Sequence, residues 1–409
     1  MTGSRPRSVL GRLGRGPVHP FPARMAAALV YDILDGADRP LTVLDPMMGS
    51  GTVLAIARST GHRSIGVDID PLAVLISRVW TTAVDYSTVM FAANQILKRA
   101  AFRSRSLRQA RAYPPNADDE TKRFVRYWFD PYARRQLAAL ALTIRGTRDD
   151  KTRAVLWCAF SRLIITKQTG ASRAMDLSHS RPHRVFERAP LKPLPNFLQA
   201  VDRTLVNCIS STSPHRGPAP RVYRGDARFL PLNSGVVDLV VTSPPYLNAI
   251  DYMRCSKFSL VWMGHTIKEL RQLRATSIGS EVGWKSPPTG QRFPPIGLEL
   301  NPPLPPHDGA ILQRYANDIS SAVAEVSRVL TNKGRAVYVV GENTIRNTFI
   351  ATSALVEQAA ESSSLVLCGR SVRALEANRR YLPPPRITGK RSLDNRIRQE
   401  VILTFEKRG

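Results

Sequence analysis

Five consecutive residues near the middle of the chain combine a hydroxyl, a rigid turn and an aromatic ring. They are Thr242, Ser243, Pro244, Pro245 and Tyr246. The two prolines stiffen the backbone and leave carbonyl oxygens without competing local N–H donors. The Ser243 hydroxyl is a further hydrogen-bond acceptor, and Tyr246 offers a flat face for stacking. Such a segment can accept hydrogen bonds from the N–H groups of an amine that lies against an aromatic ring. The alternative is an ordinary Pro-Pro turn after a strand.

A second segment, nearer the N-terminus, has the composition of a ligand-binding turn. It reads Asp45-Pro46-Met47-Met48-Gly49-Ser50-Gly51-Thr52. Gly49 and Gly51 allow the backbone to approach a ligand closely and present N–H groups at the start of a helix. About twenty residues further on, Asp68 ends the next predicted strand, where a carboxylate can accept both hydroxyls of a ribose. Asp70 is the fallback for this role, although it could instead cap the following helix.

The predicted elements bring these two segments to one edge of a sheet. Apolar runs alternate with helical patterns on both sides of a long central region, which predicts a doubly wound, mostly parallel, seven-stranded α/β sheet. Ligands bind such sheets beyond the carboxyl ends of the strands. Both segments directly follow a predicted strand. The predicted strands are residues 41–44, 64–67, 222–224, 237–241, 336–340, 365–367 and 401–405.

The predicted helices and loops separate these strands. Helices are expected at 53–59, 71–80, 247–263 and 311–330, the last of them ended by Asn332, Lys333 and Gly334. Residues 84–220 show helices and loops without a convincing strand, and Leu137, Leu140, Ala141 and Ile144 define one face of an amphipathic helix there. Two more helices are expected in this insertion, at 154–165 and 196–208. Residues 264–308 are predicted to be a second, proline-rich loop insertion.

Together, the two segments resemble the motifs of the N4-cytosine and N6-adenine amino-methyltransferases. The resemblance covers about residues 18–80 and 221–407, with the cofactor motif first. Met47 replaces the aromatic residue that is usual in the first motif. The resemblance implies a Rossmann-like methyltransferase domain at 18–83 and 221–409, S-adenosylmethionine as cofactor, no metal, and double-stranded DNA as the substrate. A restriction endonuclease partner is a further expectation.

The resemblance also implies roles for individual residues. Ser243 and a proline carbonyl would accept hydrogen bonds from an exocyclic amine, which frees its lone pair for attack on a sulfonium methyl group. Tyr246 would stack against an extruded base. Ser243 favours N4 of cytosine over N6 of adenine, and the chain has no Pro-Cys pair for C5-cytosine methylation. The expected cofactor contacts are Phe21, Asp45, Pro46, Met47, Gly49, Ser50, Gly51, Thr52, Asp68 and Asp226; for Asp226 a strand-end turn is the equal alternative.

Basic residues in the insertion at 84–220 indicate contact with DNA, since arginine and small hydroxyl residues suit phosphates. A solvated basic loop is the alternative. One arginine-rich stretch covers residues 99–111. The predicted DNA-binding residues lie in a second stretch and are Arg173, His179, Arg181, His183 and Arg184. His179 and His183 have the spacing of helical metal ligands, but Pro182 argues against a helix and hence against a metal site.

Charge and composition narrow the class of protein. The 409 residues carry a formal net charge of +27, which favours a polyanionic partner. Four cysteines without a CxxC pair predict reduced thiols and a cytoplasmic protein, and no apolar run is long enough to span a membrane. Association with the nucleoid is expected from the resemblance to bacterial DNA methyltransferases. Residues 1–17 are expected to be a flexible basic arm, with a transit peptide as the alternative. Two other functions stay open: an RNA base methyltransferase, and a DNA-binding module without activity.

Overall fold

The computed structural model describes residues 10–21, 24–177, 182–212, 216–247, 252–280, 300–345, 348–374 and 399–409. Seven strands form one sheet in which only β11 runs antiparallel to its neighbours. The predicted fold class is therefore confirmed. In order across the sheet, the strands are β10 (Leu365–Ala374), β11 (Gln399–Lys407), β7 (Leu330–Gly341), β6 (Val237–Thr242), β1 (Thr42–Asp45), β2 (Arg63–Asp68) and β5 (Arg221–Arg224).

The order of the strands reverses between β1 and β6. From β1 the chain passes through α3 (Thr52–Ser59) to β2 on one side, and β6 pairs with β1 on the other side. At such a point the connections leave in opposite directions, and open α/β sheets generally bind ligands there. The region beyond the carboxyl ends of β1 and β6 is called the crevice below. The two chemically distinctive segments of the sequence both begin at this crevice, one after β1 and one after β6.

Helices cover both faces of the sheet. Leu44 and Val240 pack with α12 (Pro306–Val329) and α13 (Thr352–Glu361) on one face. Their sequence neighbours Val43 and Val241 face the opposite side, where α3 and α2 (Ala27–Leu34) pack. This alternation follows from the pleat of a strand, which points successive side chains to opposite faces.

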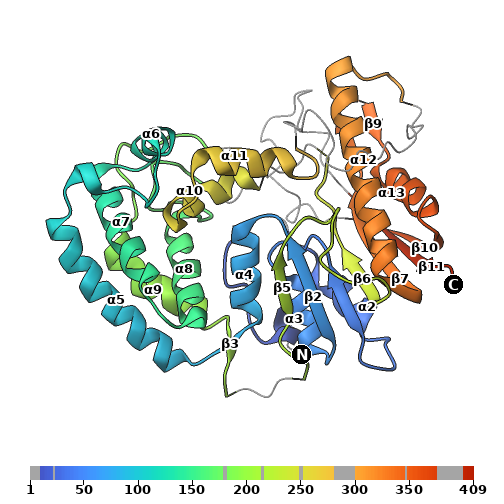
Figure 1. Cartoon of the computed structure of the whole chain (residues 1–409), viewed down its shortest axis with the longest axis horizontal. Coiled ribbons are helices and arrows are strands. Elements are labelled where there is room, and N and C mark those ends of the chain that lie inside the picture. The colour runs from blue at the N-terminus through green and yellow to red at the C-terminus, as the bar shows by residue number, and fades with distance from the viewer. Residues whose placement is uncertain are drawn as a thin grey trace, which may run out of the picture.

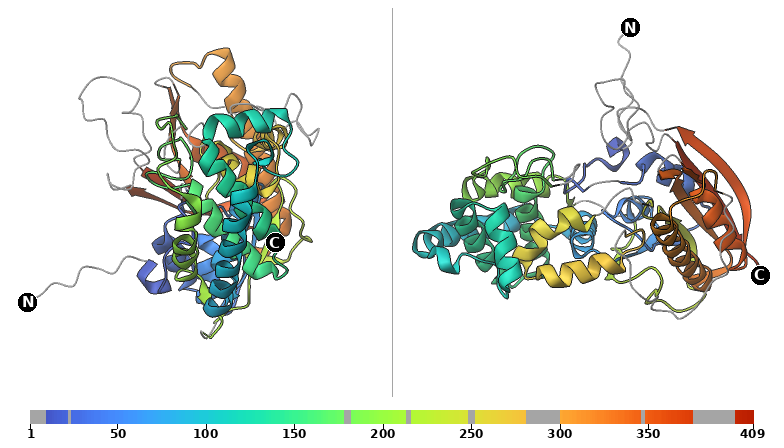
Figure 2. Two further views of the ribbon diagram at one scale, coloured as in Figure 1. Left: turned by 90° about the vertical axis from the view of Figure 1, so that its left-hand side faces the viewer. Right: turned by 90° about the horizontal axis from the view of Figure 1, so that it is seen from above.

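The insertion is a helical body beside the sheet (Figures 1 and 2). Aspartate side chains begin four of its helices by accepting backbone N–H bonds, which satisfies donors that a helix leaves unpaired. These caps are Asp85, Asp118, Asp130 and Asp149. The elements of the insertion are α5 (Tyr86–Ser106), η1 (Gln109–Arg111), α6 (Asp119–Trp128), α7 (Pro131–Arg145), α8 (Asp150–Ile164) and α9 (Pro193–Leu205).

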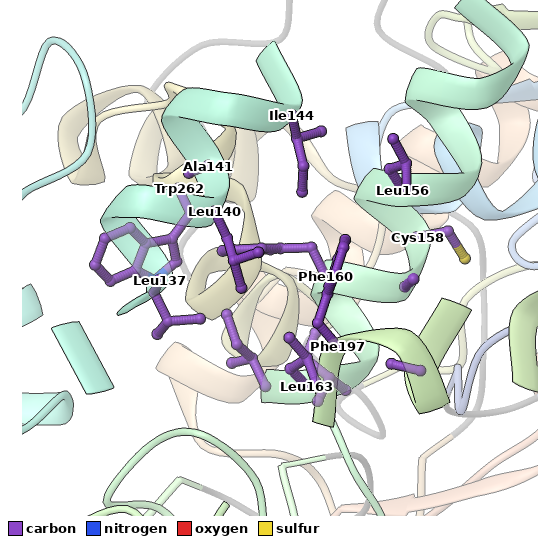
Figure 3. Packing of buried hydrophobic residues seen from close by; sticks show 14 of the residues in the cluster. Leu137, Leu140, Ala141, Ile144, Leu156, Cys158, Phe160, Leu163, Phe197 and Trp262 are labelled. Atoms are coloured by element: carbon purple, nitrogen blue, oxygen red, sulfur yellow. The ribbon is translucent and has the colours of Figure 1, made fainter. Parts of the chain in front are cut away.

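One apolar core joins the insertion to the element that follows the Pro-Pro-Tyr segment. The predicted amphipathic face of α7 is buried, as expected. It packs toward Phe160 and Leu163 of α8, Phe197 of α9 and Trp262 of α10 (Met253–Met263) (Figure 3). Helix α10 also contacts α4 (Pro71–Thr81), which lies against β2 and β5. The insertion therefore packs against α10, which follows the Pro-Pro-Tyr segment, and against α4, which follows β2.

Three predictions of local structure are wrong. β3 (Ala83–Val84) and β4 (Ile209–Ser210) form a parallel pair between the two ends of the insertion, where no strand was expected. Two residues are too few to carry a period-two pattern. The loop predicted at 264–308 contains α11 (Ile267–Thr276), which a capping box between Thr266 and Glu269 begins. Residues 281–299 of that loop lie outside the described residues.

The third error lies at the junction of α12 and β7. Helix α12 ends at Val329 and β7 begins at Leu330, so the residues expected to end the helix lie inside the strand. Lys333 has a left-handed backbone there, with φ 60. The hairpin of β8 (Asn343–Ile345) and β9 (Thr348–Ile350) was not predicted. In the described part of the chain, none of the helices combines the length and the apolar character that crossing a membrane requires.

Candidate functional site

A hydrogen bond joins the two distinctive segments at the crevice. The Thr242 hydroxyl, at the end of β6, donates to Asp45 Oδ1, at the end of β1, over 2.8 Å. Asp45 also accepts the N–H of Met47. Both Thr242 and Asp45 are buried. Burial raises the pKa of Asp45 to about 7, although the hydrogen bonds from Thr242 and Met47 oppose the shift.

The turn after β1 depends on its glycines. Gly49 and Gly51 both have left-handed backbones, with φ 50 and φ 83. A Cβ atom on Gly51 would overlap Ser77 Oγ of α4, whereas one on Gly49 would lie 3.4 Å from Phe21 Cε1. Since left-handed backbone favours glycine, the sequence pattern Gly-Ser-Gly is the local cause of this sharp turn. The expectation that both glycine N–H groups face a ligand is wrong, because the Gly49 N–H donates to Asp68 and the Gly51 N–H donates to the Met48 carbonyl.

Asp68 and Asp70 have different partners. Asp68 Oδ2 accepts the Gly49 N–H over 2.8 Å, so this carboxylate touches the glycine turn directly. Burial, with the nearby Asp70 charge, raises the pKa of Asp68 to about 7, although part of the residue stays exposed. Asp70 caps α4 through the Leu72 N–H and accepts the Ser256 hydroxyl over 2.6 Å. The capping role that the sequence offered for Asp70 is the one it has.

Two aromatic rings lie beside the glycine turn. Phe21 and Tyr252 are stacked, with ring centroids 5.6 Å apart and an interplanar angle of 9°. Burial, together with the negative charge of Asp68, raises the pKa of Tyr252. The sequence predicted Phe21 but not Tyr252, because Tyr252 lies six residues beyond the Pro-Pro-Tyr segment and only folding returns it to the first motif.

The Pro-Pro-Tyr segment is held by residues distant in sequence. The Tyr246 hydroxyl donates to Glu400 Oε1 of β11 over 3.0 Å. Burial and the Glu400 charge raise the pKa of Tyr246. The Tyr315 hydroxyl of α12 donates to the Pro245 carbonyl over 3.0 Å. Pro245 therefore has a partner already, and the Pro244 carbonyl is the better candidate to accept from a substrate.

Asp226 is engaged by a buried arginine. Arg228 donates to both carboxylate oxygens of Asp226, with Nη2 2.7 Å from Oδ2. The same guanidinium pairs with Asp318 of α12 and donates to the Thr276 carbonyl. No pattern in the sequence predicts this cluster, which joins the end of β5 to α12 and α11. A contact of Asp226 with a cofactor would have to share the carboxylate with Arg228.

The predicted DNA-binding residues separate into three groups. Arg173 donates to the carbonyls of Glu187, Arg126 and Tyr127, so much of its guanidinium is used at the C-terminal end of α6. Arg184 is exposed, with its guanidinium carbon 5.5 Å from the centroid of the Tyr127 ring. His183 is also exposed. His179 and Arg181 lie outside the described residues.

The charge of the crevice suits a cationic ligand. Neither Asp45 nor Asp68 has an ion-pair partner in the part of the chain that the structure describes. Carboxylates in a crowded, poorly solvated site are unfavourable without positive charge nearby. A ligand with a positive charge and hydroxyl donors would supply what Asp45 and Asp68 lack.

The fold and its motifs define a class: a doubly wound, Rossmann-like sheet with a glycine turn and a Pro-Pro-Tyr segment where the strand order reverses. No protein-family model matches the chain. The chain is 24% identical over 285 residues to the Type II methyltransferase M.BsoBI of Geobacillus stearothermophilus, which covers 64% of this chain and 55% of that relative. It is 21% identical to the Type II methyltransferase M.MvaI of Kocuria varians, over 95% of this chain and 88% of that relative.

Both relatives are methyltransferases, so the resemblance that the two motifs indicate is confirmed at that level. The chain spans about half the length of the first of them. Among solved structures, a DNA modification methylase from Thermus thermophilus is 18% identical, with 45% of this chain and 52% of that chain covered. Its TM-score of 0.24 is too low for that likeness to bear on fold or function.

Proposed function

We propose that the chain is an S-adenosylmethionine-dependent DNA methyltransferase that modifies an exocyclic amino group, with N4 of cytosine favoured over N6 of adenine. The observation that carries the proposal is the hydrogen bond between Thr242 and Asp45. It joins the Ser-Pro-Pro-Tyr segment to the ligand crevice, where a methyl donor and an amine must meet. The two Type II methyltransferase relatives support the reaction class, and the net charge of +27 supports a nucleic-acid substrate.

The cofactor would lie along the glycine turn. When bound, S-adenosylmethionine supplies a methyl group on a positively charged sulfur. Asp68 is the candidate acceptor for the ribose hydroxyls, because its carboxylate borders the turn. Phe21 and Tyr252 form an aromatic wall beside Gly49. The remaining proposed contacts are Asp45, Pro46, Met47, Ser50, Gly51, Thr52 and Asp226.

The chain's own residues would prepare the amine for attack. Ser243 Oγ and the Pro244 carbonyl accept its two N–H bonds, which favours a pyramidal nitrogen with a free lone pair. The Pro245 carbonyl instead fixes the segment to Tyr315 of α12. Tyr246 gives a stacking face to a base that has left the duplex. Ser243 is the reason for favouring cytosine, because the adenine enzymes of the family it resembles more often carry Asp or Asn at this position.

The insertion at 84–220 would supply much of the grip on DNA. Arg184 is exposed and stacked on an aromatic ring, which keeps its charge available. Helix α5 and η1 add a row of exposed cations, none of which has an ion pair to a described acidic residue: Lys98, Arg99, Arg103, Arg105, Arg108 and Arg111. Such side chains suit phosphates. His179, Arg181 and His183 stay in the proposal, whereas Arg173 is assigned mainly to holding α6.

Transfer of a tritiated methyl group from S-adenosylmethionine to bulk DNA and to bulk RNA tests the proposal. We expect labelled DNA from the wild-type chain, and a loss of about tenfold to a thousandfold in turnover for Ser243→Ala with cofactor affinity unchanged. Ser362→Ala, at an exposed position after α13, is the matched control. Labelled RNA alone would favour the RNA methyltransferase, and no label on either would refute an enzymatic role.

A further inference from the structure

A continuous run of hydrogen bonds connects the glycine turn to α10. The Gly49 N–H donates to Asp68 Oδ2 over 2.8 Å, and the Asp70 N–H donates to Asp68 Oδ1 over 2.9 Å. Asp70 Oδ2 then accepts the Ser256 hydroxyl of α10 over 2.6 Å. Asp70 and Ser256 are 4% and 2% exposed, so water competes little for this last bond. Since its acceptor is a carboxylate, it belongs to the stronger class of hydrogen bonds.

The first turn of α10 depends on tertiary contacts. Tyr252 occupies the N-cap position of α10, and its side chain makes no capping bond. Its carbonyl accepts the Ser256 N–H over 3.1 Å, and its ring stacks on Phe21. Phe21 lies beside the glycine turn, because a Cβ atom on Gly49 would be 3.4 Å from Phe21 Cε1. The contacts therefore return to the turn from which they started.

We propose that Ser256 is a positioning residue for the cofactor: by donating to Asp70, it holds the first turn of α10 against the N-terminus of α4 and so fixes the Tyr252 ring on Phe21 beside the glycine turn. The inference rests on the proposed function, because it needs S-adenosylmethionine along this turn. A cofactor that lies against Phe21 and Tyr252 then meets an aromatic wall that is already in place, and its binding does not have to order that wall.

The partners of Asp70 explain why the Ser256 hydroxyl matters. Asp70 Oδ1 accepts the Leu72 N–H at the start of α4 over 2.8 Å, so Oδ2 is the oxygen bonded to α10. An ionised carboxylate can only accept, and the Ser256 proton meets this requirement. Alanine at position 256 would remove both the donor to Oδ2 and this bond between α10 and α4. The first turn of α10 would then be less constrained, and the Tyr252 ring with it.

A purely structural role for Ser256 makes a different prediction. If Ser256 only joined two helices, Ser256→Ala would lower the melting temperature and leave the cofactor affinity of the folded chain unchanged. The positioning role requires that the effect pass through the Tyr252 ring. Once that ring is removed, the loss of Ser256 should have no further effect on the cofactor, and a double-mutant cycle measures such coupling.

The test is calorimetric titration of S-adenosylmethionine into the wild-type chain, Ser256→Ala, Tyr252→Ala and the double variant. We expect Ser256→Ala to weaken cofactor affinity by about tenfold, the effect of losing one hydrogen bond to a charged group. Tyr252→Ala should weaken it at least as much, and the double variant no more than Tyr252→Ala alone. In methyl transfer to DNA, KM for the cofactor should rise by a similar factor, whereas kcat at saturating cofactor should stay within about threefold.

Ser327→Ala is the matched control. Ser327 is also a buried serine on a helix, and its hydroxyl donates to the Ser363 carbonyl over 2.6 Å. It lies near the end of α12, where β7 begins, and so at the opposite edge of the sheet from the glycine turn. This variant should lower the melting temperature and keep wild-type cofactor affinity.

A second variant covers the case in which Ser256→Ala does not fold. Tyr252→Ala then decides, because Tyr252 is only half-buried and its ring is the group through which Ser256 is inferred to act. A loss of cofactor affinity of about tenfold or more in Tyr252→Ala supports the inference. Wild-type affinity in Tyr252→Ala overturns it.

The two levels of the hypothesis fail in different ways. A wild-type chain that does not bind S-adenosylmethionine refutes the proposed function, and the inference falls with it. A wild-type chain that binds the cofactor, with unchanged affinity in folded Ser256→Ala or with losses that multiply in the double variant, overturns the role of Ser256 alone.

Discussion

Acidification should weaken cofactor binding, because two carboxylates of the crevice titrate near neutral pH. The pKa values of Asp45 and Asp68 are both raised to about 7, mainly by burial. A cationic cofactor with hydroxyl donors binds the ionised forms. At about pH 8 a group with a pKa near 7 is roughly nine-tenths ionised, and at about pH 6 it is roughly one-tenth ionised. Each carboxylate therefore weakens binding by about tenfold between these values, and both together by up to about a hundredfold.

The same pKa shifts determine how the stability of the cofactor-free chain changes with pH. The folded-state pKa of each group lies above its ordinary value of 3.8, so the folded chain binds more protons than the unfolded chain between about pH 4 and pH 7. The stabilisation from these two groups is complete below about pH 4 and is lost as the pH rises through 7. Because the cofactor binds more tightly at pH 8, it should raise the melting temperature more at pH 8 than at pH 6.

Calorimetric titration of S-adenosylmethionine at several pH values, in buffers of different ionisation enthalpy, measures both the affinity and the protons released. Asp68→Asn removes one titrating group. The affinity of this variant for S-adenosylmethionine should therefore change about tenfold less than that of the wild-type chain over the same pH range. Comparing the two profiles cancels the titration of the cofactor's own amino group. An Asp68→Asn profile parallel to that of the wild-type chain, or a wild-type affinity that does not fall on acidification, would refute the reasoning.

Three other predictions concern the cofactor turn, the grip on DNA and the product. Gly49→Val places a branched side chain on a left-handed backbone against Phe21, so cofactor binding should disappear in calorimetry while the fold still melts cooperatively; wild-type affinity would contradict the assignment. Arg184→Ala should reduce the slope of log affinity for duplex DNA against log salt concentration by about 0.9. Arg173→Ala should mainly lower the melting temperature, because Arg173 donates to backbone carbonyls. Equal slopes in both variants would argue against a phosphate contact of Arg184. Mass spectrometry of nucleosides from methylated DNA should show N4-methylcytosine, and a methyladenine peak would overturn the preference drawn from Ser243.

Local sequence patterns were sufficient to predict many of the strands, the glycine turn and one buried helix face. The strands β1, β2, β6 and β7 were readable because buried parallel strands are short apolar runs between turns and helices. The glycine turn was readable because left-handed backbone restricts the residue type at Gly49 and Gly51. The four-residue spacing of α7 predicted its buried face. Each of these features depends on residues that are close together in the sequence, so the sequence alone determined them.

Tertiary structure alone decided which distant residues complete the site. Glu400 and Tyr315 are ordinary positions on β11 and α12, and only the sheet order brings them to the Pro-Pro-Tyr segment. The same holds for Arg228, whose pairing with Asp226 and Asp318 needs β5 and α12 side by side. The reason is physical: a hydrogen bond between residues far apart in the chain leaves no periodic trace in the sequence, since its geometry is set by the packing of whole elements. The sequence contains the groups that can do the chemistry, and the packing of the elements determines which of them touch one another.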